Sequence, residues 1–246
     1  LLHNSAVVVS KDATMSMNRF TLLALVTILL GCSSGNPYVP SQFTAQESDG
    51  YEFNWDSRVN TDGLVSESGT YPNVANVLNE EQPMLRLYRE DVTHQAVVDF
   101  FRELTGSEEI ALPILYHADR NDLPVSLVFA LSWVESRFSP YAINANSHSI
   151  DRGLFQLNSK SFVQLSTDDF FHPEVNARHG TDYLKFSLNY GGDHRTAVAI
   201  YNAGLTRVRQ DRIPQSTQNH VERVMAYKSS LERQIERYIR RRFPTS

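Results

Sequence analysis

The chain has 246 residues, a formal net charge of −5 and 41% hydrophobic residues. This ordinary globular composition supplies enough apolar side chains for a sizeable core, and the length allows one or two domains. A protein without an excess of lysine and arginine lacks the charge that attracts nucleic-acid phosphates, so we expect no nucleic-acid partner.

A short apolar segment lies near the N-terminus, where Arg19 precedes the run FTLLALVTILL at residues 20–30. A helix that spans a bilayer takes about 20 residues, so this run is too short to cross one comfortably. Its length and flanks are typical of the hydrophobic region of a secretory signal. We therefore predict that residues 1–31 hold upstream residues and a signal peptide, with translation starting at Met15 or Met17.

The predicted signal ends in Leu-Leu-Gly-Cys, residues 29–32, and Cys32 is the only cysteine in the sequence. This tetrapeptide resembles the lipobox of bacterial lipoproteins, in which the cysteine is lipidated and becomes the first mature residue. The resemblance implies a lipid anchor at Cys32. Ser33, which follows it, is typical of lipoproteins on the periplasmic face of the outer membrane. A plain signal peptide with an incidental cysteine is the alternative.

The next segment, residues 32–83, is predicted to be a tether. Up to about residue 80 it is rich in Ser, Asn, Gly, Pro and acidic residues, and its apolar residues show no lasting period of 2 or 3.6. Such a composition buries too little apolar surface to fold by itself. We expect it to hold the following domain away from the membrane as a flexible linker.

Helical periodicity begins at about residue 84. Apolar side chains from Val92 to Leu104 form one stripe at helical spacing, and Gly106 ends that helix. Strand signals are few, so we predict a mostly α fold and assign residues 84–246 to one helical domain. The other helices are predicted at about 108–119, from a cap at Asp122 to near Glu135, and at 159–166, 174–189, 194–203 and 217–242.

One acidic residue ends an apolar sequence: Glu135 stands in LPVSLVFALSWVESRF, residues 123–138. An ionised carboxylate is costly in a dry site, which indicates either a partner or a function. Taken alone, a glutamate at the end of an apolar helix is more often an exposed acid.

Two later strings change that balance, RGLFQLN at residues 152–158 and AIYNAG at 199–204. With VESRF they resemble the catalytic domain of the soluble-type, family 1 lytic transglycosylases, whose pattern is Glu-Ser, Gly-Leu-Met-Gln and Ala-Tyr-Asn-Ala-Gly. Two further family segments are similar to HPEVNARHGTDYL at 172–184 and IPQSTQNHV at 213–221. Each string is weak alone, but the five occur in the family's order over about residues 108–225.

The resemblance implies a lysozyme-like fold and an enzyme that cleaves the β-1,4 bond between N-acetylmuramic acid and N-acetylglucosamine in peptidoglycan glycan strands. Glu135 is then the acid toward the leaving sugar and afterwards the base toward the C6 hydroxyl, giving a 1,6-anhydro sugar without water. The substrate's acetamido group replaces the second carboxylate of paired glycosidases. Apolar surroundings, which Val128, Leu131 and Trp133 supply near Glu135, favour the proton-carrying form of a carboxylic acid. No metal or other cofactor is needed, and we expect a monomer.

The family's other site residues carry over by position. Ser136 would orient Glu135 or the leaving group, with a helix-end hydrogen bond as the alternative. Gly153 would let the backbone approach the ligand, and Gln156 would hydrogen-bond the sugar or its acetamido group. Tyr201 would donate its hydroxyl near the acid, and Asn202 would bind substrate.

Three departures from the family pattern leave alternatives open. Asp151 lies before the Gly-Leu-Phe-Gln string and could position a water, as in goose-type lysozymes, which would make the protein a hydrolytic muramidase. It could equally form a surface ion pair with Arg152 or Arg137, which would contribute little. His220 stands where tyrosine is common, and Ile200 where alanine is common. A non-catalytic, peptidoglycan-binding lipoprotein is a further alternative.

Overall fold

The computed structural model describes residues 72–244. The predicted signal peptide, Cys32 and most of the predicted tether lie outside this range. The described residues form ten helices and three short strands, which confirms the mostly α prediction. No helix among them is both long enough and apolar enough to span a membrane.

In chain order, the elements are α1 (Pro72–Val77), α2 (Pro83–Arg89), α3 (Asp91–Thr105), α4 (Glu108–Arg120), α5 (Val125–Ser136), β1 (Ile143–Ala145), β2 (Ile150–Arg152), β3 (Leu157–Asn158), α6 (Thr167–Phe171), α7 (Pro173–Gly191), α8 (His194–Ala203), α9 (Leu205–Arg209) and α10 (Gln215–Arg242).

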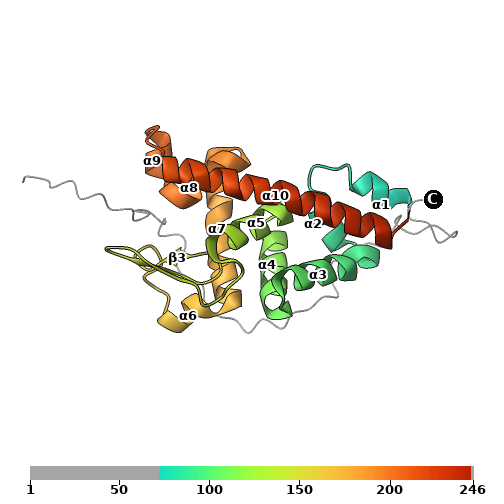
Figure 1. Cartoon of the computed structure of the whole chain (residues 1–246), viewed down its shortest axis with the longest axis horizontal. Helices are drawn as coiled ribbons and strands as arrows, with labels where there is room; N and C mark the ends of the chain where they lie inside the picture. The colour runs from blue at the N-terminus through green and yellow to red at the C-terminus, as the bar shows by residue number, and fades with distance from the viewer. Residues whose placement is uncertain (1–71, 245–246) are drawn as a thin grey trace, which may run out of the picture. The chain divides into compact units, whose positions relative to one another are not determined.

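Helix α5 lies at the centre of the domain (Figure 1). Every residue from Val125 to Leu131 is buried, because α5 packs against α2, α4 and α10. Its Phe129 ring stacks on Phe101 of α3 with ring centroids 4.0 Å apart. The apolar sequence that precedes Glu135 therefore belongs to a helix enclosed on several sides, which fixes where its C-terminal end lies.

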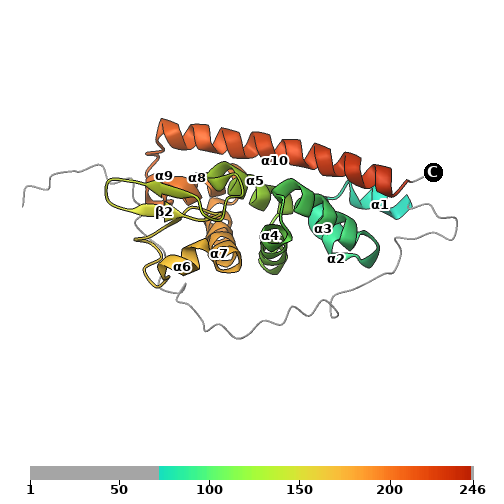
Figure 2. The same cartoon turned by 60° about the horizontal axis from the view of Figure 1, so that its bottom comes forward.

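The longest helix, α10, runs along one side of the other helices (Figure 2). Its buried side chains recur at helical spacing and face α3, α5 and α8. The opposite face is polar, as expected for an amphipathic surface helix. This helix covers α5 over much of its length and brings residues near position 220 beside the end of α5.

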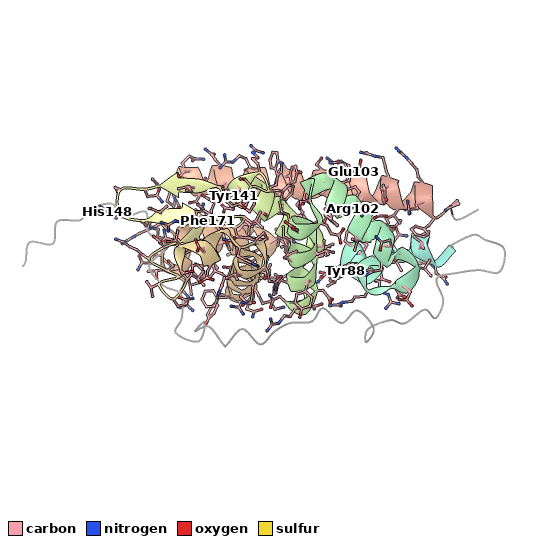
Figure 3. All side chains as sticks on the ribbon, turned by 90° about the horizontal axis from the view of Figure 1, so that it is seen from below. Tyr88, Arg102, Glu103, Tyr141, His148 and Phe171 are labelled. Carbon is pink, nitrogen blue, oxygen red and sulfur yellow. The ribbon has the colours of Figure 1, made fainter. Side chains whose placement is uncertain are left out.

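The three strands form a small antiparallel sheet in the order β1-β2-β3. In its register Asn144 pairs with Asp151, and Asp151 pairs with Asn158. Figure 3 shows Tyr141, His148 and Phe171 at the end of the domain that carries this hairpin. The strands have only two or three residues, which explains why few strand signals are visible in the sequence.

Packing begins earlier than residue 84, where the periodic sequence pattern starts. Val74 and Val77 of α1 are both buried in the core, and α1 packs against α2. With only two apolar side chains turned inward, α1 is too short to show a helical period in the sequence. Residues 72–83 are thus part of the packed domain, although the tether was predicted to extend to residue 83.

Two local predictions were wrong. Residues 159–166 form turns instead of a helix, and the short helix α6 follows them, begun by a capping box between Ser166 and Asp169. Asp122 does not cap α5, because its carboxylate accepts a hydrogen bond from Arg89, and Pro124 occupies the N-cap position.

Candidate active site

A pocket of about 240 Å³ opens where α5, the small sheet, α7 and α8 meet. Four of the predicted site residues line it: Glu135, Gln156, Tyr201 and Asn202. They come from three separate parts of the chain, so the fold brings the Glu-Ser, Gly-Leu-Phe-Gln and Tyr-Asn-Ala-Gly strings together. The other side chains in its wall are Asn144, Asp151, Leu157, Asn158, Phe162 and Tyr183.

Glu135 lies in the last turn of α5, and its side chain is only 14% exposed. The helix ends at Arg137, which adopts a left-handed backbone conformation and donates its N–H to the carbonyl of Trp133. The Trp133 ring stacks on Tyr227 of α10, and the guanidinium of Arg137 lies 3.4 Å from the Trp133 ring centroid. These contacts fix the end of α5, and with it the direction of the Glu135 side chain.

The carboxylate of Glu135 has a close ionisable neighbour on α10. Its Oε1 lies 3.3 Å from Nε2 of His220, whose side chain is 6% exposed. The contact is not aligned as a hydrogen bond, and Nε2 has no other hydrogen-bond partner in the described part of the chain.

The loop that carries Gln156 is held by one buried asparagine of α7. Asn176 is fully buried, donates to the carbonyl oxygens of Arg152 and Phe170, and accepts the backbone N–H of Phe155. Gly153 has a φ of 77°, and a Cβ there would lie 2.2 Å from both Asn176 Nδ2 and the Phe170 carbonyl oxygen. Gly153 therefore permits the close approach of the protein's own α6–α7 segment, where a ligand was expected.

Gln156 has a positive φ of 49°, and its side chain turns back on the loop. Its amide nitrogen donates to the carbonyl oxygens of Ala142 and Gly153, at 3.1 and 3.0 Å. Both amide hydrogens are thereby used. The amide oxygen has no partner within residues 72–244, so it is the atom of Gln156 that can accept a hydrogen bond from a ligand.

Tyr201 is buried at the base of the pocket and donates its hydroxyl to the carbonyl oxygen of Phe155, at 2.9 Å. Burial, and then the negative charge of Glu135, raises the pKa of Tyr201 well above its usual value of 10. The hydroxyl therefore keeps its proton and donates it to the Phe155 carbonyl oxygen. It also ties α8 to the Gly-Leu-Phe-Gln loop.

Asn202 is exposed to the pocket, and its amide oxygen accepts a hydrogen bond from the hydroxyl of Thr217 on α10, at 2.7 Å. Thr217 is itself buried. The bond fixes which way the amide faces, and it leaves the Asn202 amide nitrogen without a partner in the described residues. Asn202 therefore presents a donor to the pocket, while Gln156 presents an acceptor.

Asp151 also faces the pocket, and its two carboxylate oxygens are held by Asn158 and Asn146, at 2.6 and 2.8 Å. Within residues 72–244 it makes no ion pair, so the predicted pairing with Arg152 or Arg137 is wrong. The guanidinium of Arg137 lies on Trp133 instead, and that of Arg152 lies 5.3 Å from the ring centroid of Phe170.

Ser136 and Gly153 do not line the pocket. The Ser136 hydroxyl is buried and donates to the carbonyl oxygen of Ser132, one turn earlier in α5. This is the helix-end hydrogen bond that the sequence allowed as the alternative role of Ser136. The positions of both residues support a structural part in holding Glu135 and Gln156.

Sequence reasoning missed half of the pocket wall. Phe162 and Tyr183 read as ordinary core residues, and nothing local distinguishes them. Asn144 and Asn158 had a detectable signal, since polar asparagines recur in INANSHS, residues 143–149, and at the end of RGLFQLN. No group of three or more His, Cys, Asp or Glu side chains within residues 72–244 is arranged to hold a metal ion.

Residues 113–227 match the family model described as the transglycosylase SLT domain. The matched segment runs from α4 into α10 and includes every residue in the pocket wall, together with His220.

Proposed function

Because residues 113–227 belong to the transglycosylase SLT domain family, which acts on peptidoglycan, we propose that this chain is a lytic transglycosylase. It cleaves the β-1,4 bond between N-acetylmuramic acid and N-acetylglucosamine and leaves a 1,6-anhydro end on the muramic acid. The observation that carries the proposal is the shared pocket of Glu135, Gln156 and Tyr201, in which Glu135 is mostly buried at the end of an apolar helix.

Glu135 acts as the acid in the first step and gives its proton to the oxygen of the leaving sugar. The acetamido oxygen of the substrate then stabilises the positive charge at the reacting carbon. In the second step the Glu135 carboxylate takes the proton of the C6 hydroxyl, whose oxygen attacks that carbon.

The remaining polar atoms of the pocket bind the sugars. The Gln156 amide oxygen accepts a hydrogen bond from a sugar hydroxyl or acetamido N–H, and the Asn202 amide nitrogen donates to a sugar oxygen. Tyr201 holds the Gly-Leu-Phe-Gln loop against α8 through its bond to Phe155. Binding energy from these groups positions the glycosidic oxygen against Glu135.

The cellular setting is proposed from the sequence. Lipidation at Cys32 anchors the chain to the periplasmic face of the outer membrane, and the segment after it lets a monomeric domain reach the glycan strands. Labelling with radioactive palmitate tests the anchor, since Cys32→Ala removes the label if this cysteine is the site.

Digestion of purified sacculi tests the activity. Wild type should release muropeptides with anhydro ends, identified by mass spectrometry, and Glu135→Gln should release at least about a hundredfold less because it loses the general acid. Glu109→Gln removes the same charge at an exposed position in the first turn of α4 and should behave as wild type. Equal activity of Glu135→Gln and wild type would refute the proposal.

A hydrolytic muramidase is the second candidate, because Asp151 lies in the pocket wall with a carboxylate that could position a water. It predicts reducing ends in place of anhydro ends, and their loss in Asp151→Asn. A protein that binds sacculi but releases no fragments would instead be a non-catalytic wall-binding lipoprotein.

A further inference from the structure

His220 is a buried histidine that the proposed mechanism does not use. It lies on α10, two turns before Tyr227 on the same helix, and reaches the end of α5. Its Nε2 is 3.3 Å from Oε1 of Glu135 and has no other hydrogen-bond partner in the described part of the chain. A buried polar nitrogen without a hydrogen-bond partner costs free energy. The Glu135 carboxylate is the neighbour that can supply this hydrogen bond to His220.

The position of His220 is that of a supporting residue. It contacts Glu135 but is not among the side chains that line the pocket. Thr217, one turn earlier on the same face of α10, holds the Asn202 amide in the same way. The first turns of α10 thus support two pocket residues at once.

Glu135 is the acidic group within ion-pair distance of His220 among the described residues, and the Glu222 carboxylate on α10 pairs with Arg195.

We infer that His220 is a positioning residue for the Glu135 carboxyl group. The inference rests on the proposed function. His220 donates its Nε2–H to Oε1 after a small side-chain rotation. This leaves Oε2 to carry the proton, give it to the leaving oxygen and take one back from the C6 hydroxyl.

Two variants separate positioning from packing. His220→Gln keeps an N–H donor near the place of Nε2, and His220→Phe keeps an apolar ring without the donor. The initial rate of muropeptide release from sacculi is measured for each variant. His172→Gln, at an exposed position before α7, is the matched control, and thermal unfolding confirms that each variant is folded.

His172→Gln should match wild type, His220→Gln should stay within about threefold of it, and His220→Phe should fall by about tenfold, which is the loss of one hydrogen bond. Equal rates of His220→Phe and wild type, or equal losses in His220→Gln and His220→Phe, would overturn the inference alone. A wild type that releases no fragments would instead refute the proposed function and the inference together.

Discussion

The buried asparagine that holds the Gln156 loop gives the most direct test of the site's architecture. Asn176→Ala removes three hydrogen bonds at once, to the carbonyl oxygens of Arg152 and Phe170 and from the N–H of Phe155. The substitution leaves these backbone groups in place. Because Asn176 is fully buried, water cannot reach them without opening the contact between α6 and α7.

The expected cost follows from these three bonds. A typical hydrogen bond contributes about 1 kcal/mol net, and a buried group left without a partner costs about 1–3 kcal/mol. Three such groups therefore predict a loss of roughly 3–9 kcal/mol in the free energy of unfolding. Domains of this kind are stable by about 5–15 kcal/mol, so a loss in the lower half of that range leaves the variant folded at low temperature.

Urea unfolding, followed by tryptophan fluorescence, measures this loss. The matched control is Asn121→Ala, which removes an amide that bonds Thr181 and Asp182 at a partly exposed position. Water replaces those bonds, so we expect a cost of about 1 kcal/mol or less. If Asn176→Ala costs no more than Asn121→Ala, Asn176 does not hold the loop. The folded variant should also lose activity, since Gln156 is no longer fixed.

Three further outcomes are expected. Gly180→Ala should lower the free energy of unfolding by about 1–3 kcal/mol in urea titrations, because its Cβ would lie 2.3 Å from Cγ of Phe155. Phe155→Leu in the same chain should recover part of this loss, and no recovery would contradict this packing. Burial lowers the pKa of His179 from 6.5 to about 4, so the unfolded chain binds a proton that the folded chain does not, and wild-type stability should fall by roughly 3 kcal/mol from pH 6.5 to 4. His179→Gln should remove that pH dependence, and an unchanged slope would refute the assignment. Thr217→Val frees the Asn202 amide and should raise KM about threefold with kcat nearly unchanged, the cost of one hydrogen bond; a change in kcat alone would argue against a binding role.

The sequence predicted the helical class and most helices because the signals are local. Apolar residues at helical spacing identify α3, α4, α7, α8 and α10, and Gly106 ends α3 as its φ of 73° requires. The same local signals failed for residues 159–166 and for the short strands, where one or two hydrogen bonds decide the conformation.

The motifs also identified the central pocket residues, since Glu135, Gln156, Tyr201 and Asn202 do meet in one pocket. Their hydrogen-bond partners were not predictable. The Tyr201 hydroxyl binds the Phe155 carbonyl oxygen instead of being free for the substrate, because loop and helix meet only after α7 and α8 have packed.

The sequence by itself thus determined which residue types were available for chemistry and which stretches would be helical. Only the tertiary structure decided that Asp151 faces the pocket between two asparagines, and that His220 comes within 3.3 Å of Glu135. The physical reason is that helix formation depends on neighbours three or four residues apart. Contacts between α5, the sheet and α10 depend on how whole elements pack, which no short stretch of sequence contains.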